Sequence, residues 1–114
     1  MITLYGISNC DTVKKARNWL DQAQVTYSFH DFRKDGLTPE QVTGWVSTLG
    51  WETLVNKRST TWKALDEATR AGLNDSSVVN IILEHPTLIK RPLLDNAGDL
   101  RVGFKAIDYQ KLFI

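Results

Sequence analysis

Apolar positions recur with two different spacings along the first third of the chain. Ile2–Tyr5 is short, β-prone and alternating, which predicts a strand. From Asp11 to about Ala23 the apolar residues recur every third or fourth position, which predicts a helix with one buried face. Val25–Phe32 predicts a second strand after the helix. A strand, a helix and a strand in close succession form a βαβ unit, so we expect the two strands to be parallel.

The middle of the chain carries helix signals in place of strand signals. Thr38 suits an N-cap, Pro39 suits the first helical position, and Gln41 completes a capping box, while Gly50 can end this helix. Further helices are expected at Trp51–Val55, from Ser59 or Thr60 to near Gly72, and from a cap at Asp75 or Ser76 to Pro86.

The last quarter of the chain returns to strands. Pro92–Asp95 and Leu100–Phe104 flank the turn-forming run Asp95–Asp99, which predicts a hairpin. A final helix is expected from about Ile107 or Asp108 to Phe113. This order of elements predicts an α/β fold in which helices flank a four-stranded mixed sheet.

Composition excludes several classes of protein. The length of 114 residues suits one domain, and a formal net charge of +1 gives no general case for direct binding of nucleic acid or an anionic membrane. No apolar run reaches the roughly 20 residues of a membrane helix, and the first residues do not resemble a signal peptide. With one cysteine there is no intrachain disulfide, so we expect a cytoplasmic protein. We also expect the protein to be a monomer.

Cys10 is the one cysteine and lies between the first strand and the first helix. The free N–H groups and partial positive charge of a helix N-terminus favour a thiolate, which is the nucleophilic form. Lys14 adds positive potential, whereas Asp11 opposes it. The position alone leaves two interpretations open: a reactive thiol, or a small buried hydrophobic residue. His30 and His85 are too scattered to predict a metal site.

Two basic segments are further candidates. Arg91 could bind an anion through its guanidinium fork or pair with a thiolate, or it could be a solvated side chain. Asn56, Lys57 and Arg58 could hold a carboxylate or an oxyanion, or they could form a solvated loop.

The chain resembles the ArsC/Spx family, and within it the YffB-like branch of small bacterial proteins. The resemblance rests on Leu4-Tyr5, Asn9-Cys10, Lys14-Lys15-Ala16, Trp19-Leu20, Pro39, Val42, Lys57-Arg58-Ser59, Leu65, Pro86, Leu88-Ile89-Lys90-Arg91-Pro92-Leu93-Leu94, Leu100 and Val102-Gly103-Phe104. It implies a single domain, 1–114, with a thioredoxin-like four-stranded mixed sheet and an inserted helical subdomain at about 37–86.

The resemblance also implies the parts of an active site. Cys10 would be the nucleophile, Arg91 would lie near it, and a cis bond would precede Pro92, whose backbone would face the cysteine and a thiol partner such as glutathione. The implied function is that of a glutathione-dependent thiol reductase that uses one cysteine. Lys14, Asn56, Lys57 and Arg58 are then candidates for binding the substrate, with Lys57 and Arg58 facing the carboxylates of glutathione.

Departures from the family pattern bear on two alternatives. Arsenate reductases of this family carry Gly-Thr-Ser-Arg after the cysteine, whereas this chain has Asp11-Thr12-Val13-Lys14. Val13 has no hydroxyl and Lys14 has no guanidinium fork, which argues against arsenate as a substrate. Spx-type regulators, which bind RNA polymerase, often switch through Cys-x-x-Cys. Val13 stands at the second cysteine position, so such a switch cannot form within this chain, although binding to the polymerase stays open.

Overall fold

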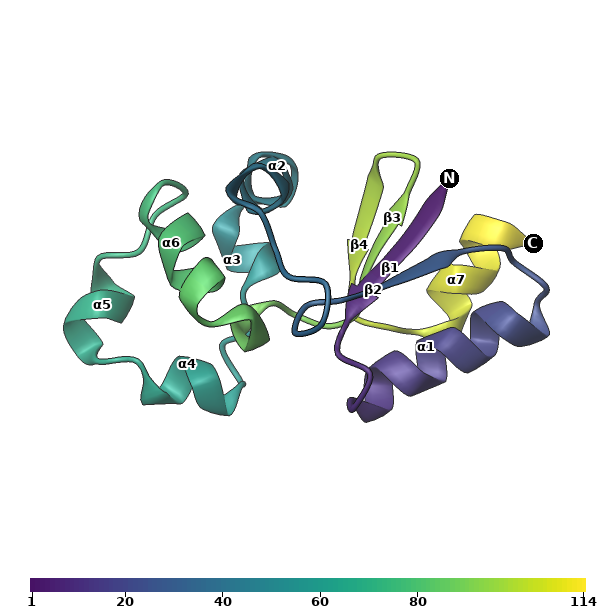
Figure 1. Ribbon diagram of the computed structural model, residues 1–114, viewed down its shortest axis with the longest axis horizontal. Coiled ribbons are helices and arrows are strands. Elements are labelled where there is room, and N and C mark those ends of the chain that lie inside the picture. Colours follow the sequence, from purple (N-terminus) through teal and green to yellow (C-terminus); the bar gives the residue numbers. More distant parts are fainter. The chain divides into compact units, whose positions relative to one another are not determined.

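The computed structural model describes residues 1–114, which divide into two compact units (Figure 1). The first, here called the sheet unit, comprises Met1–Asp35 and Arg91–Ile114. The second, here called the helical unit, comprises Gly36–Lys90, and the helical segment expected at about 37–86 lies within it.

The sheet unit contains one four-stranded sheet in the order β2-β1-β3-β4. Its strands are β1 (Ile2–Gly6), β2 (Ser28–Asp31), β3 (Leu93–Asn96) and β4 (Asp99–Val102). β1 runs parallel to β2 and antiparallel to β3, which pairs antiparallel with β4. The predicted parallel pair, the hairpin and the mixed four-stranded sheet are therefore confirmed.

Two helices pack on one face of this sheet, namely α1 (Asp11–Gln22) and α7 (Ala106–Phe113). Leu4 and Leu94 are opposite each other in the β1–β3 ladder, and both are completely buried. Ala16 and Leu20 of α1 and Tyr109 of α7 complete the core cluster around them. This arrangement matches the apolar periodicity of Asp11–Ala23, whose buried positions recur every three or four residues.

Tyr109 carries a polar group in the middle of that apolar cluster. Its side chain is 1% exposed, and its ring makes edge-on contacts with Trp19 and Phe104. The hydroxyl group has no hydrogen-bond partner. Burial raises the pKa of Tyr109 because the phenolate would be poorly solvated there.

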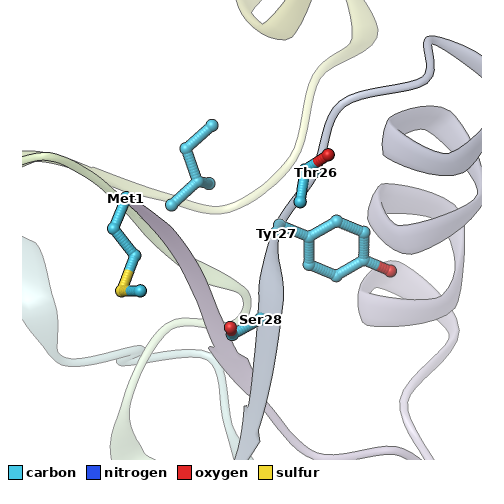
Figure 2. A pocket seen from close by; sticks show the side chains of 5 residues that line it. Met1, Thr26, Tyr27 and Ser28 are labelled. Atoms are coloured by element: carbon cyan, nitrogen blue, oxygen red, sulfur yellow. The ribbon is translucent and has the colours of Figure 1, made fainter.

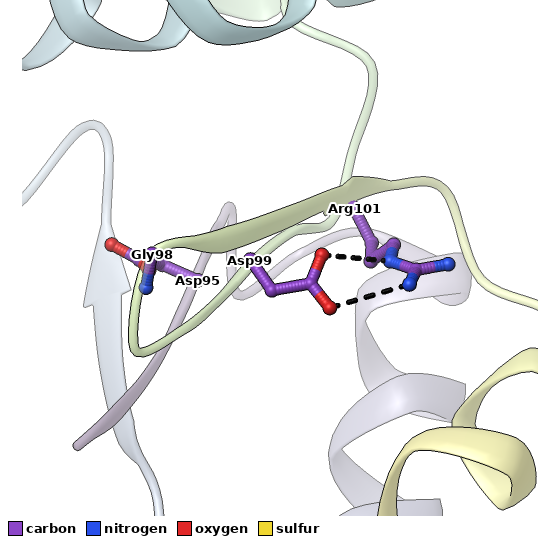
Figure 3. A network of polar contacts seen from close by, with 4 residues as sticks. All are labelled: Asp95, Gly98, Asp99 and Arg101. Atoms are coloured by element: carbon purple, nitrogen blue, oxygen red, sulfur yellow. Dashed lines mark hydrogen bonds and ion pairs between the residues drawn. The ribbon is translucent and has the colours of Figure 1, made fainter.

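The β3–β4 hairpin turns at Ala97 and Gly98, which both have positive φ. The Gly98 N–H donates to the Asp95 carboxylate at 2.8 Å, which closes the turn. On β4, the Arg101 guanidinium donates to both oxygens of Asp99 at 3.0 and 3.2 Å (Figure 3). Charged side chains therefore line this edge strand, which discourages its pairing with another chain.

The second strand is shorter than the predicted Val25–Phe32. Thr3 is opposite Ser28 in the parallel ladder, so Val25 and Thr26 lie before the start of β1 and have no neighbouring strand to pair with. Val25 packs against the core cluster instead. The alternating pattern of Val25–Phe32 indicates that one face of the segment is buried. Where the ladder of hydrogen bonds begins is decided by the register of the neighbouring strand, β1.

The helical unit begins with α2 (Pro39–Leu49), whose predicted capping box is confirmed. The Gln41 N–H donates to Thr38 Oγ1 at 3.2 Å, and the Thr38 N–H donates to Gln41 Oε1 at 2.9 Å. The helix ends at Gly50, whose φ of +80° suits glycine. α3 (Trp51–Leu54) follows directly, as expected.

The helix predicted from Ser59 or Thr60 to near Gly72 is in fact two helices. α4 (Thr60–Ala64) and α5 (Glu67–Ala71) are separated by Leu65, whose backbone is extended. The Asp66 carboxylate then accepts the Thr69 N–H at 2.6 Å and starts the second helix. The prediction was wrong because it did not treat Asp66 as an N-cap, although aspartate is a preferred residue there.

The next helix, α6 (Ser77–Glu84), has Ser76, one of the two predicted caps, at its N-cap position, but the Ser76 side chain makes no capping hydrogen bond. Asn74 Oδ1 accepts the N–H groups of Ser76 and Ser77 at 2.9 and 2.8 Å. Asp75, one of the two predicted caps, instead accepts the Trp51 N–H at 3.2 Å. The 3₁₀ helix η1 (Pro86–Leu88) closes the unit. No helix in the chain combines the length and the apolar character that a membrane crossing requires.

Candidate functional site

Cys10 occupies the N-cap of α1, at the end of a four-residue loop that leaves β1. Its backbone is extended, its carbonyl accepts the Lys14 N–H at 2.9 Å, and its side chain makes no capping hydrogen bond. The thiol is free and the residue is partly exposed. The side chain therefore lies at the positive end of a 12-residue helix with access to solvent.

The start of α1 packs closely on the end of β1 at Gly6. A Cβ at this glycine would lie 2.8 Å from Cγ2 of Val13, a side chain with no exposed surface. That separation is shorter than van der Waals contact allows, so Gly6 permits the approach that fixes the first turn of α1 beneath the strand. Val13 points into the core and contributes nothing polar to the surroundings of Cys10.

Asp31, at the end of β2, holds the loop that carries Cys10. Its side chain is 4% exposed, and one carboxylate oxygen accepts the Ser8 N–H at 3.1 Å. The other oxygen accepts the N–H groups of Arg33 and Lys34 at 2.8 and 3.2 Å. Burial alone would raise the pKa of Asp31, but these three backbone donors outweigh it and hold the pKa below its usual value.

Arg91 and Pro92 lie at the same end of the sheet as this loop. Leu93 is opposite Tyr5 in the β1–β3 ladder, so the Arg91–Pro92 segment enters β3 where β1 leaves toward Cys10. The peptide bond between Arg91 and Pro92 is cis, as the family resemblance implied. Pro92 is buried, and its carbonyl accepts the Gly103 N–H at 2.9 Å. Arg91 is partly exposed, and no side chain of the sheet unit pairs with its guanidinium group.

Asn56, Lys57 and Arg58 belong to the helical unit. Asn56 Oδ1 accepts the Arg58 N–H at 3.0 Å, so this amide shapes its own turn. The Lys57 ammonium lies 5.1 Å from the ring of Trp51 and 3.9 Å from the Glu52 carboxylate. Arg58 is exposed. Lys57 thus already has partners for its charge, whereas the Arg58 side chain is open to solvent.

Lys57 also lies over a second aromatic ring, that of Trp62, at 5.8 Å. The rings of Trp51 and Trp62 stack with their centroids 6.3 Å apart. The stacked pair therefore contributes to the packing of the helical unit, and Lys57 covers it.

Comparison with known proteins gives the family. The model of the ArsC family matches residues 5–112 of the chain. The chain belongs to the ArsC family. An uncharacterized protein of Haemophilus influenzae is 46% identical over 113 residues, which cover 99% of each chain. The global transcriptional regulator Spx of Streptococcus agalactiae is 30% identical over 110 residues, which cover 91% of this chain and 77% of the regulator.

A solved structure has the same fold. The protein YFFB superimposes with a TM-score of 0.95 at 41% identity over the full length of both chains. The thioredoxin-like architecture expected for an ArsC-family protein is therefore confirmed, with its four-stranded mixed sheet.

The sheet unit gathers some, but not all, of the residues that the sequence singled out. Cys10, Lys14, Arg91 and Pro92 belong to it, and their roles in chemistry stay predictions. Asp31 was not predicted, because an aspartate in a β-prone run gave no sign that its carboxylate is buried. Its position at the end of a strand parallel to the strand before Cys10 could have suggested it. No three histidine, cysteine, aspartate or glutamate side chains gather in a way that could hold a metal ion.

A shallow groove of about 380 Å³ lies at the opposite end of β1 from Cys10. Met1 and Ile2 line it together with Thr26 and Tyr27, which precede β2, and with Ser28, the first residue of β2 (Figure 2). Because β1 separates this groove from Cys10, the groove is no part of the candidate active site.

Proposed function

We propose that this ArsC-family protein is a thiol–disulfide oxidoreductase that uses Cys10 as its nucleophile and glutathione as its co-substrate. The observation that carries the proposal is the position of the only cysteine of the chain, partly exposed at the N-cap of α1. Thiolates at such positions are stabilised by the helix, and the thiolate is the reactive species.

Arg91 supports the proposal because it is a cation without an assigned partner at the Cys10 end of the sheet. A guanidinium group stays charged throughout the working pH range, so it can neutralise a thiolate or a carboxylate without exchanging protons. We assign it this role. Lys14, whose ammonium is exposed in the first turns of α1, would add to the positive potential.

The reaction needs no metal and one protein thiol. The Cys10 thiolate attacks one sulfur of oxidised glutathione, a protein–glutathione disulfide forms, and the second glutathione leaves as a thiolate that takes up a proton. In the other direction, a glutathione thiolate attacks the mixed disulfide and releases Cys10 while oxidised glutathione forms. When the substrate is a mixed disulfide of glutathione and another thiol, Cys10 attacks the glutathione sulfur and the other thiol leaves in its reduced form, taking up a proton. A free glutathione thiolate then releases Cys10, so the free glutathione and the glutathione carried by the substrate end together as oxidised glutathione. Within the helical unit, Arg58 is a better candidate than Lys57 for binding a carboxylate, since Lys57 already contacts Glu52 and Trp51.

Arsenate reduction is less well supported by the surroundings of Cys10. Arsenate is a compact anion that needs several converging donors. Val13 is buried and has no hydroxyl, Lys14 offers a point charge in place of a fork, and Asp11 adds a negative neighbour. Glutathione spreads its charges over a longer molecule and depends less on such a pocket.

The test compares wild type, Cys10→Ser, Arg91→Ala and Lys63→Ala, the last being an exposed lysine of α4 with no assigned role. We expect wild type to form a one-to-one adduct with oxidised glutathione, seen by mass spectrometry, and Cys10→Ser to form none. Arg91→Ala should slow adduct formation by about 10-fold or more, the loss expected for one charge-assisted interaction. Lys63→Ala should react like wild type.

A parallel assay measures arsenite production with glutathione and glutaredoxin. Efficient arsenate turnover without any glutathione adduct would overturn the proposal in favour of arsenate reduction.

A second candidate is a regulator that binds RNA polymerase, which the similarity to Spx favours. Such a role needs no reactive thiol. Capture of RNA polymerase from a bacterial lysate by both wild type and Cys10→Ser, together with an unreactive Cys10, would support this alternative.

A further inference from the structure

We propose that Asp31 is a positioning residue for the Cys10 nucleophile, holding the loop before Cys10 in the geometry that accepts a glutathione sulfur. The inference rests on the proposed function of Cys10, but it names a residue on another strand that neither the motif around Cys10 nor the family resemblance singles out. It starts from the bond between the Asp31 carboxylate and the Ser8 N–H, two residues before Cys10.

The loop from Ile7 to Cys10 is fixed at its two ends by regular structure. Gly6 ends β1, and its carbonyl accepts the Phe32 N–H at 2.9 Å. At the other end of the loop, the Cys10 carbonyl accepts the Lys14 N–H of α1 at 2.9 Å. Between these ends, the Ser8 N–H donates to the buried carboxylate of Asp31. This bond is therefore the contact between the loop and the neighbouring strand at the level of Ser8.

The carboxylate is itself held rigidly. Its other oxygen is bound by the Arg33 and Lys34 N–H groups, and the Asp31 N–H donates to the Asp35 carboxylate at 2.9 Å. An ionised carboxylate can accept all three backbone donors, because both of its oxygens are acceptors. An asparagine cannot, because its NH₂ group would face a donor N–H on one side.

An aspartate that served the turn after β2 alone would need only the oxygen bound by Arg33 and Lys34. The second oxygen reaches across to the loop before Cys10, where it accepts the Ser8 N–H. Ionised carboxylates bound by several N–H groups form strong, directional hydrogen bonds. Asp31 thus couples the end of β2 to the path of the chain into the active-site cysteine.

The test uses two thiol reagents on wild type and Asp31→Asn. Iodoacetamide is small and reports the thiolate fraction of Cys10, which the loss of a nearby negative charge also changes. Oxidised glutathione reports the thiolate fraction and the orientation of Cys10 together. The rate constant with oxidised glutathione divided by the rate constant with iodoacetamide therefore isolates the effect of orientation. We expect this ratio to fall about fivefold in Asp31→Asn, which is the effect of one lost hydrogen bond.

Two control variants exclude simpler causes. Asp35→Asn removes a carboxylate charge four residues away, yet its amide oxygen can still accept the Asp31 N–H. Val78→Ala shortens a fully buried side chain of α6 in the helical unit and lowers stability without touching the loop. Both should keep the wild-type ratio. An unchanged ratio in Asp31→Asn, or an equal fall in Val78→Ala, would overturn the inference.

A second measurement keeps the inference separate from the proposed function. In the amide spectrum recorded by NMR, Asp31→Asn should shift the Ser8 signal and broaden those of Asn9 and Cys10, while signals of α7 stay in place. A wild type that forms no glutathione adduct would refute the proposed function, and this spectrum alone would then decide the positioning role: an unmoved Ser8 signal refutes it.

Discussion

Asp31 shows how one side chain joins stability to the candidate active site. The sequence places it inside a β-prone run, where a charged residue is expected to face solvent. In the structure its carboxylate is buried and is satisfied by the N–H groups of Ser8, Arg33 and Lys34. These donors stabilise the ionised form in the folded protein more than water does in the unfolded chain, which lowers the pKa of Asp31.

The lowered pKa predicts a specific dependence of stability on pH. The contribution of ionised Asp31 is fully present above the pKa of an aspartate in the unfolded chain, about 4, and is lost as the pH falls through the lower pKa of the folded state. The free energy of unfolding of wild type should therefore exceed that of Asp31→Asn by a constant amount above about pH 5, and the difference should shrink below about pH 4.

Urea unfolding at a series of pH values measures this difference. Asp35→Asn, an exposed neighbour, is carried through the same series so that general acid destabilisation cancels. A wild-type advantage that persists undiminished at pH 3 would show that ionisation of Asp31 does not contribute.

At the scale of elements, the contact between β1 and α1 depends on one missing side chain. Gly6 has nothing but hydrogen where a Cβ would come within 2.8 Å of Val13. Its φ is not positive, so the need for glycine here is steric and does not come from backbone conformation. The packing of the first turn of α1, and with it the position of Cys10, follows from this close approach.

This contact predicts a coupling between two substitutions. Gly6→Ala should lower the free energy of unfolding by about 1–3 kcal/mol, because β-branched Val13 has little freedom to move away. Val13→Ala should be destabilising by itself, yet the double variant should be more stable than the sum of the two losses by about 1 kcal/mol. Chemical denaturation of the four proteins measures this coupling.

Gly44→Ala is the matched control, since this glycine lies inside α2 with open space around it. It should stabilise the protein by about 0.5–1 kcal/mol through its higher helix propensity. Strictly additive losses at Gly6 and Val13 would contradict the steric explanation.

At the scale of the whole molecule, burial is distributed unevenly among the elements. Leu4, Leu93 and Leu94 of the central strands have no exposed surface, whereas α4 and α5 each have five residues and no buried one. Short helices gain little from their own hydrogen bonds and depend on packing for stability. Stability should therefore be lowest in the segment from Thr60 to Ala71.

Native-state hydrogen exchange tests this distribution. We expect amide protection in α4 and α5 to be at least about 100-fold lower than in β1 and β3. α6 belongs to the same unit as these two helices but buries Val78 and Ile82, so it should be better protected. Equal protection of α4, α5 and α6 would mean that the helical unit opens only as one body.

The sequence by itself determined the elements whose signals are local. The capping box at Thr38, the turn before Asp99 and the periodicity of α1 depend on neighbouring residues, and their predictions are confirmed. Local signals also placed Cys10 between a strand and a helix. They misplaced the start of β2 and missed the break at Leu65, where several local signals compete.

Only the tertiary structure decided which groups from distant segments meet. The burial of Asp31, its bond to Ser8 and the contact of Gly6 with Val13 depend on strand register and on helix packing. The same holds for Lys57, whose charge the sequence left free and the fold places over two tryptophan rings. A sequence pattern reports which residues are buried, whereas the long-range contacts that close a site arise only when the parallel β1–β2 pair and the β1–β3 ladder have formed.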